Sequence, residues 1–342
     1  MNRVSGLTTL TRISGQLITI SLCIAFFVSG CATRESSNIL KTGKDEFVRN
    51  LLVPSSGPSV EYYVSVPKQK SPLVIYLQGS GCTPVFPPTG FGSDHASTVF
   101  SSTTIARNYP VVVMVINKPY APRLAPKSAG IANNCPQEFN EYFSLESWVT
   151  HIETAFKHAR RLPLVDTSRT LVIGTSEGAT VAAALAARNH EITDVAIVSG
   201  SGPTQFFDFV AGAYASTQDQ TKVADALSEL DAERVAIIAS PKDSKKFAWG
   251  HPYKRWSSFF ASSSLENLAK SGARIYVVSG MSDTSVPILS TEVLYSELLW
   301  KGRDITMRRI PYANHALVRE GFTLKEAEAE YDRILQWFLL QH

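Results

Sequence analysis

The chain has 342 residues, of which 44% are hydrophobic, enough for one large domain with a substantial core and an inserted subdomain. Its 33 basic residues slightly outnumber its 30 acidic ones, and two of the basic residues, Arg3 and Arg12, fall in an N-terminal segment typical of a leader. The remainder is nearly neutral and has no dense basic run, which argues against a nucleic-acid partner.

Residues 1–30 have the pattern of a secretory signal peptide, with positive charge followed by an apolar stretch at 17–28. The stretch is too short for a stable transmembrane helix. It ends in Val28-Ser29-Gly30-Cys31, which resembles the lipobox of bacterial lipoproteins, where the bond before the cysteine is cut and the cysteine carries the lipid. By this resemblance we expect a membrane anchor at Cys31. Ala32, in place of an aspartate, favours the periplasmic side of an outer membrane if the source is Gram-negative. A plain secretory signal or an uncleaved anchor is the alternative.

The four cysteines fit export. Cys23 would leave with the leader and Cys31 would be lipidated, so Cys82 and Cys135 remain. In an oxidising compartment two remaining cysteines predict one disulfide, and two unpaired buried thiols are the alternative.

Residues 31–59 are polar and contain Pro54-Ser55-Ser56-Gly57-Pro58, a composition that predicts a tether leading into a domain at 60–342. Beyond it, short apolar runs alternate with helical patterns. The continuous runs at 73–77 and 111–116 are typical of strands buried on both faces, and the alternating run at 60–66 predicts an antiparallel edge strand. We predict an α/β fold, with a mostly parallel central sheet and helices on both faces. The other expected strands are 170–173, 194–199, 274–279 and 305–310, and the expected helices are 145–156, 178–188, 292–300 and one beginning at Thr323.

Residues Gly174-Thr175-Ser176-Glu177-Gly178 match the Gly-x-Ser-x-Gly pattern of a nucleophile elbow. In an elbow a sharp strand-to-helix turn lifts the serine above the sheet, and glycines flank it because a side chain there would clash. The motif follows an apolar strand and opens a helix, which is the context that the chemistry requires. We therefore predict Ser176 as the nucleophile, in preference to a surface Gly-Ser turn.

Two further residues follow later strands in the order that a serine triad needs. Asp283 comes directly after the strand 274–279, and His315 comes directly after the strand 305–310. Alone, the aspartate is typical of a turn and the histidine of a structural loop residue. Because ligands and chemistry gather at the carboxyl ends of such strands, we predict Asp283 as the orienting acid and His315 as the base.

These motifs resemble α/β-hydrolases of the dienelactone-hydrolase and prolyl-oligopeptidase type. In those families Gly-x-x-Asp-x-x-Val-Pro, here residues 280–287, precedes a helix, a strand and a turn that carries the histidine. The match runs from about residue 73 to the C-terminus, without the middle stretch. The resemblance implies the α/β-hydrolase fold and a serine hydrolase that needs no organic cofactor. The histidines lack metal-ligand spacing, so we expect no metal site.

The family resemblance also implies an oxyanion hole made of two backbone N–H groups. One belongs to Glu177, the residue after the nucleophile. The other lies in the loop Gln78-Gly79-Ser80-Gly81-Cys82, where Ser80 is the expected donor. Many relatives have His-Gly where this chain has Gln78-Gly79. A phosphate-binding loop is the rival interpretation, but no phosphate-loop motif follows.

The strand-helix rhythm breaks at about 201–272, which predicts a helical cap over the site. Its aromatic residues line a pocket for an apolar acyl or aryl group or, as we prefer for most of them, form the cap's own core. Its basic residues, Lys242, Lys245, Lys246, Lys254 and Arg255, either attract an anionic substrate or, in the interpretation that we prefer, form a solvated face. The aromatic residues are Phe206, Phe207, Phe209, Tyr214, Phe247, Trp249, Tyr253, Trp256, Phe259 and Phe260.

The predicted function is hydrolysis of small or medium carboxylic esters through an acyl-enzyme intermediate. A peptidase or amidase, or a thioesterase, of the same fold is the alternative. A protein of a different class, an envelope lipoprotein that binds a partner without catalysis, would not need an intact Ser-Asp-His set.

Overall fold

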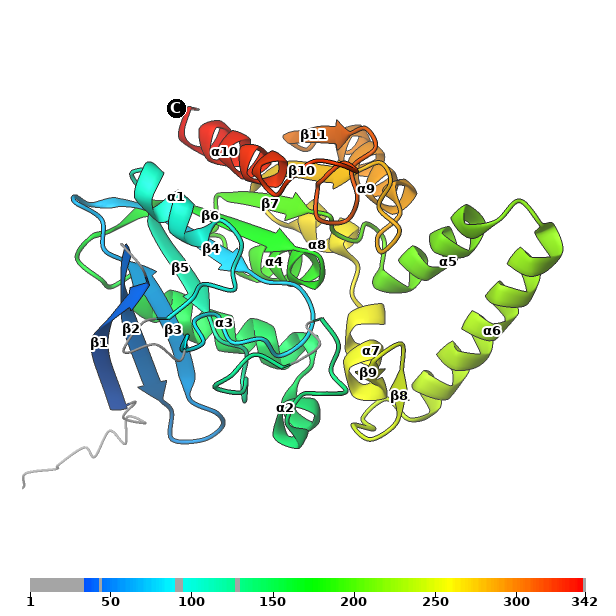
Figure 1. Ribbon diagram of the computed structural model, residues 1–342, viewed down its shortest axis with the longest axis horizontal. Coiled ribbons are helices and arrows are strands. Elements are labelled where there is room, and N and C mark those ends of the chain that lie inside the picture. Colours follow the sequence, from blue (N-terminus) through cyan, green and yellow to red (C-terminus); the bar gives the residue numbers. More distant parts are fainter. Residues whose placement is uncertain (1–33, 43–44, 90–94, 127–129, 341–342) are drawn as a thin grey trace, which may run out of the picture. The chain divides into compact units, whose positions relative to one another are not determined.

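The computed structural model describes residues 34–42, 45–89, 95–126 and 130–340. In these residues nine strands form one sheet (Figure 1). Six strands run parallel to one another: β4, β5, β6, β7, β10 and β11. The other three, β1, β2 and β3, are antiparallel to their neighbours. The predicted α/β class is therefore confirmed. In spatial order the strands are β1 (Arg34–Thr42), β2 (Asp45–Val53), β3 (Val60–Ser65), β5 (Val112–Ile116), β4 (Ser71–Leu77), β6 (Val165–Thr175), β7 (Asp194–Val198), β10 (Arg274–Gly280) and β11 (Ile305–Ile310).

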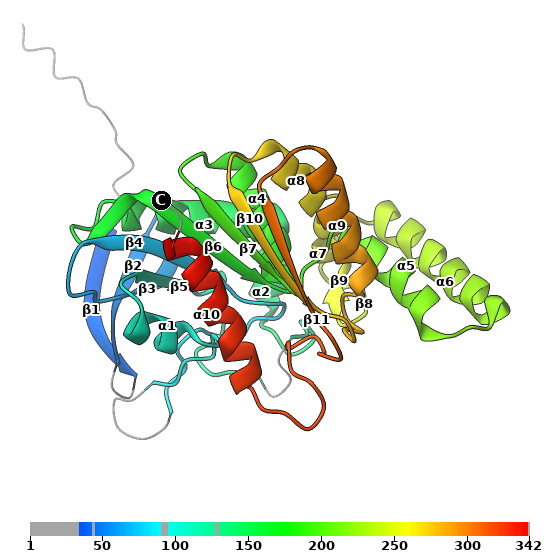
Figure 2. The same ribbon diagram turned by 90° about the horizontal axis from the view of Figure 1, so that it is seen from above.

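Helices cover both faces of this sheet, as the sequence predicts (Figure 2). One face packs against α3 (Leu145–Ala159), α4 (Glu177–Arg188), α8 (Ser264–Lys270) and α9 (Ile288–Trp300), and the other against α1 (Ser102–Asn108) and α10 (Lys325–Leu340). Alternate residues of β4 serve the two layers: Ile75 belongs to the first core and Val74 to the second. Burial of each such side chain contributes about 1.5–3 kcal/mol, so the two cores hold the sheet rigidly.

The segment expected to be a polar tether instead begins the sheet, which corrects the sequence prediction for residues 34–53. β1 and β2 form an antiparallel hairpin, and β2 pairs with β3. The reason is burial of apolar side chains of β2. Phe47 is fully buried with its ring 4.9 Å from that of Phe86, and Leu52 is buried as well. The Pro54–Pro58 motif forms only the connection from β2 to β3.

The predicted leader and Cys31, the predicted site of lipid attachment, lie outside the described residues. Within the described ranges, no helix is both long and apolar enough to cross a membrane.

The stretch expected to be a cap contains α5 (Gln205–Ser216), α6 (Gln220–Ala239), a two-stranded ribbon of β8 (Phe247–Ala248) and β9 (His251–Pro252), and α7 (Tyr253–Phe260). Figures 1 and 2 show α5 and α6 extending away from the sheet. α8 lies within the expected cap boundaries but belongs to the body, because its Leu268 is part of the main core. The short α2 (Gln137–Tyr142) precedes α3.

Candidate active site

Ser176 lies in a strained turn between β6 and α4. Its φ of 56° and ψ of −121° fall in a backbone region that residues other than glycine rarely adopt. The turn is tight: a Cβ on Gly178 would lie 2.3 Å from the carbonyl oxygen of Leu77. The Ser176 amide donates to the carbonyl of Val198 at 2.9 Å, which ties the turn to β7. The elbow geometry that the motif predicts is therefore present.

Asp283 and His315 meet although 32 residues separate them in the sequence. Nδ1 of His315 lies 2.7 Å from Oδ2 of Asp283. The other carboxylate oxygen, Oδ1, accepts the amides of Ser285 and Val286 at 2.8 and 2.9 Å. An imidazole whose Nδ1 donates to a carboxylate presents Nε2 as a proton acceptor, and the His315 side chain is 32% exposed.

The loop after β4 passes directly beside Ser176. A Cβ on Gly79 would lie 3.4 Å from the Cβ of Ser176. The side-chain hydroxyl of Ser80 donates to the carbonyl of Gly130 at 2.8 Å. Among the described residues, the N–H groups of Ser80 and Glu177 have no recorded acceptor, so both are free to bind a ligand oxygen.

A buried ion cluster, which no local sequence pattern indicates, surrounds the side chain of Glu177. Oε1 accepts from Nζ of Lys118 at 2.6 Å, and Oε2 accepts from Nε and Nη2 of Arg255 at 3.0 and 2.7 Å. The side chains of Lys118, Glu177 and Arg255 are 0, 2 and 3% exposed. Placing Arg255 on a solvated face was therefore wrong. Lys242, Lys245 and Lys246 are exposed as expected.

The charges in this cluster control the pKa of Glu177. Burial raises the pKa, but the charges of Lys118 and Arg255 outweigh burial and hold it at about 2. His251 lies close by, and burial lowers its pKa to about 3, so its ring is neutral near pH 7. Glu177 is thus an anion between two cations, one residue from the candidate nucleophile.

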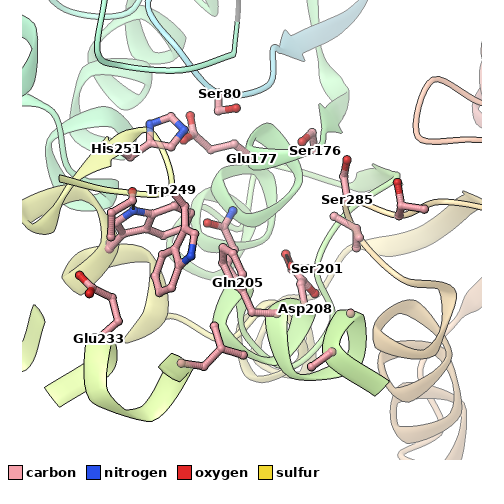
Figure 3. A pocket seen from close by; sticks show the side chains of 18 of the residues that line it. Ser80, Ser176, Glu177, Ser201, Gln205, Asp208, Glu233, Trp249, His251 and Ser285 are labelled. Atoms are coloured by element: carbon pink, nitrogen blue, oxygen red, sulfur yellow. Dashed lines mark hydrogen bonds between the residues drawn. The ribbon is translucent and has the colours of Figure 1, made fainter. Parts of the chain in front are cut away.

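A cavity of about 860 Å³ is lined by Ser176, Glu177, His251 and Arg255 (Figure 3), whereas Lys118, Asp283 and His315 do not line it. Ser80, Ser176, Glu177 and Ser285 lie along one side, and Trp249 lies on the cap side. The cap aromatics serve both of the roles considered from the sequence, as the cap's own core and as the lining of a pocket. Phe209, Trp249, Trp256 and Phe260 pack on one another as the cap's own core, and the first three of them also line the cavity.

Asp208 of α5 is a second buried carboxylate in this cavity, and it is not among the residues predicted from the sequence. It accepts hydrogen bonds from the hydroxyls of Ser201 and Ser290, the latter at 2.6 Å, and so links the cap to α9. Burial raises its pKa to about 7 in spite of these hydrogen bonds. A local pattern could not reveal it, since an aspartate in the first turn of a helix is usually exposed.

The raised pKa of Asp208 predicts a pH-dependent stability. The folded state binds the Asp208 proton more tightly than the unfolded chain does, so this contribution is complete below pH 4 and is lost as pH rises to about 7. Relative to Asp208→Asn, the unfolding free energy of the wild type should fall by on the order of 3–4 kcal/mol between pH 4 and pH 8. Urea titrations of both proteins at several pH values measure this difference, and parallel pH profiles would contradict it.

Cys82 and Cys135 form the expected disulfide, with Cα atoms 5.9 Å apart and a sequence separation of 53. The bond fixes the end of the loop that carries Ser80. Replacing both cysteines by alanine should lower the unfolding free energy by about 2–4 kcal/mol and lower kcat, because the loop loses its anchor. Denaturant titrations with and without dithiothreitol test this: reductant should destabilise the wild type and leave the double variant unchanged. Equal unfolding free energies of the wild type and the double variant, both without reductant, would count against a structural role for the bond.

Within the described ranges, no three His, Cys, Asp or Glu side chains are grouped so that they could hold a metal ion.

Residues 149–341, more than half of the chain, match the model of the prolyl oligopeptidase family. No curated protein matches the chain. Among solved structures, dipeptidyl peptidase 4 of Porphyromonas gingivalis is 15% identical with a TM-score of 0.53, covering 91% of this chain and 36% of that one. Acylaminoacyl peptidase of Pyrococcus horikoshii is 12% identical with a TM-score of 0.54, covering 90% of this chain and 41% of that one.

Est1E of Butyrivibrio proteoclasticus is 14% identical with a TM-score of 0.52, and the match covers 89% of this chain and 98% of that one. At such identities the likeness shows the fold alone. The chain spans about two fifths of the length of the two peptidases.

Proposed function

The chain belongs to the prolyl oligopeptidase family and is a serine hydrolase of the α/β-hydrolase fold, and from this premise we propose that it cleaves carboxylic esters with Ser176, His315 and Asp283. The observation that carries the proposal is the 2.7 Å contact between His315 and Asp283, at the same sheet edge as the strained Ser176 turn. Acyl transfer requires a nucleophile, a base and an acid that orients the base, and these three residues supply groups of those kinds.

In the proposed mechanism Nε2 of His315 takes the proton of the Ser176 hydroxyl as the oxygen attacks the ester carbonyl. Asp283 keeps the imidazole in the required tautomer and stabilises the imidazolium. The N–H groups of Ser80 and Glu177 bind the negative oxygen of the tetrahedral intermediate, each contributing about 3–4 kcal/mol. The protonated His315 then gives its proton to the leaving alcohol, and water hydrolyses the acyl-enzyme by the same steps.

The aromatic wall supports an ester with an apolar acyl or aryl group. Phe209, Trp249 and Trp256 line the cavity that contains Ser176, and such walls bind the apolar parts of small ligands. A peptidase or amidase activity is the second candidate, because the family and two of the similar structures are named for peptidases.

Labelling with a fluorophosphonate tests the proposal directly. The purified full-length protein, kept in detergent, is incubated with the probe, and the adduct is mapped by mass spectrometry. Turnover of p-nitrophenyl esters of graded chain length is compared with that of the matched p-nitroanilides. We expect an adduct on Ser176 and faster ester turnover. Anilide turnover alone would favour the peptidase, and an unlabelled folded protein would favour a binding lipoprotein.

We further propose that Cys31 carries a lipid that anchors the protein to a membrane of the cell envelope, on the strength of the Val28-Ser29-Gly30-Cys31 motif. Expression in a Gram-negative host with a radiolabelled fatty acid should label the wild type and not Cys31→Ala.

A further inference from the structure

We propose that Lys118 is a positioning residue that sets the oxyanion hole, and that Glu177 and Arg255 hold Lys118 in place. The proposal rests on the hydrolase function proposed above. It concerns residues that are fully buried and contact the two backbone segments from which the hole is built.

Lys118 follows β5 and uses all three of its ammonium protons inside the protein. Nζ donates to the carbonyl of Gly79 at 2.7 Å, to the carbonyl of Gly81 at 2.9 Å and to Oε1 of Glu177 at 2.6 Å. Three acceptors, one of them a carboxylate, favour the charged ammonium form in spite of burial.

The bond to Gly79 determines the direction of the Ser80 amide. In a trans peptide the C=O and N–H bonds point in opposite directions, and the described chain contains no cis peptide. Because Lys118 holds the Gly79 carbonyl, the N–H of Ser80 in the same peptide plane points away from Lys118. The bond to Gly81 holds the next peptide plane but one, between Gly81 and Cys82, so the same ammonium group restrains the loop on both sides of the Ser80–Gly81 peptide.

Glu177 joins the second half of the hole to the same lysine. Its backbone N–H is the other proposed donor, and its carboxylate is the third acceptor of Lys118. Arg255 holds that carboxylate from the opposite side with two hydrogen bonds. One cation therefore connects both donors of the hole, although 59 positions separate Lys118 from Glu177.

The cluster also places a net positive charge beside the reacting centre. Two cations surround one anion; His251, which faces the cluster, is neutral near pH 7, and Asp208 also interacts electrostatically with Arg255. Among the described residues, Nη1 of Arg255 has no hydrogen-bond partner, and its guanidinium carbon lies 4.1 and 4.2 Å from the ring centres of Trp256 and Phe259. Because the cluster is buried, water screens its excess positive charge only weakly. That charge therefore stabilises the negatively charged transition state more than the neutral substrate. Asp208, a further carboxylate that lines the cavity, accepts hydrogen bonds from two serines and from neither cation of the cluster.

A purely structural ion cluster would act differently. Its loss would lower stability, and the folded fraction would keep its turnover number. A positioning role predicts a loss in kcat at nearly constant KM, because the hole contacts the substrate carbonyl most strongly in the transition state.

The test compares Lys118→Met with the wild type and with Arg49→Met. Methionine has a similar length and removes the charge, while the Glu177–Arg255 pair stays. Arg49→Met is the matched control, because it removes a cation of β2 that pairs with Glu61 of β3, outside the active-site cavity. For each protein kcat and KM are measured with a p-nitrophenyl ester, and the inhibition constant is measured for a trifluoromethyl ketone, which forms a tetrahedral oxyanion on the serine.

For Lys118→Met we expect kcat to fall about 30- to 300-fold with KM within threefold, and the ketone to bind more weakly by about the same factor as kcat/KM falls. Arg49→Met should stay within threefold on all three measures. A folded Lys118→Met with near-normal kcat, a change confined to KM, or unchanged ketone affinity would each overturn the proposal.

If Lys118→Met does not fold, Glu177→Gln serves instead, because the amide keeps the shape and an acceptor for Lys118. We expect a loss of at least fivefold in kcat with matching loss of ketone affinity, and an unchanged kcat would overturn the proposal. The hydrolase function is tested separately in the wild type. A wild type that gives no adduct on Ser176 and no turnover refutes the proposed hydrolase function. An active wild type with an equally active Lys118→Met refutes only the role of Lys118.

Discussion

Replacing Ser176 with alanine is expected to lower kcat for a p-nitrophenyl ester by about three orders of magnitude or more, with the fold unchanged. The variant lacks the only atom that would form the acyl-enzyme, so turnover depends on direct attack by water within the oxyanion hole. Loss of one hydroxyl at an already strained turn should not lower stability.

Ser285→Ala is the matched control, because it removes a hydroxyl that lines the same cavity while its amide still binds Asp283. Its kcat should stay within threefold of the wild type. Circular dichroism and thermal melts verify that all three proteins are folded. Near-normal turnover by Ser176→Ala would refute the nucleophile assignment, and the fluorophosphonate adduct would then identify the residue that reacts.

Replacing Asp283 with asparagine should lower kcat by about three to four orders of magnitude. The amides of Ser285 and Val286 both donate to Oδ1 of Asp283, and they will select the orientation in which the asparagine oxygen takes that place. The asparagine NH₂ group then faces His315. Nδ1 of His315 must accept a hydrogen bond, so Nε2 carries the proton and cannot take one from Ser176.

Asp208→Asn separates this effect from a general sensitivity of the site to lost carboxylates. Asp208 is also buried and lines the cavity, but it accepts from Ser201 and Ser290 rather than from His315. Its kcat should fall less than tenfold. The measurement is kcat/KM against pH for both variants. A larger loss in Asp208→Asn than in Asp283→Asn would move the role of orienting acid to Asp208.

The fold class followed from local patterns because each element carries its own burial signal. β5 is a continuous run of buried apolar residues between polar turns, and α3 repeats its buried residues at helical spacing. Parallel strands bring their carboxyl ends to one edge, so residues that directly follow β6, β10 and β11 had to meet there. Ser176, Asp283 and His315 were therefore placed by the order of elements alone, although their roles remain proposals.

The hairpin of β1 and β2 shows where local patterns were insufficient. Residues 34–53 contain many polar side chains, because β1 is an outer strand with most of its side chains exposed. Only the burial of Phe47 against Phe86 and the pairing of β2 with β3 make the segment part of the sheet. Phe86, against which Phe47 packs, and β3, with which β2 pairs, both lie further along the chain. The composition of the segment alone therefore indicated a tether.

The sequence by itself determined the parallel part of the sheet, the elbow and the positions of three candidate catalytic residues in the order of elements, since these depend on periodicity and on residues within a single element. The tertiary structure alone decided the cluster of Lys118, Glu177 and Arg255 and the burial of Asp208. A lysine or arginine has the same local sequence whether its charge is solvated or paired in the core. The pairing depends on contacts across 59 and 78 positions, and these exist only once the sheet and the cap have packed together.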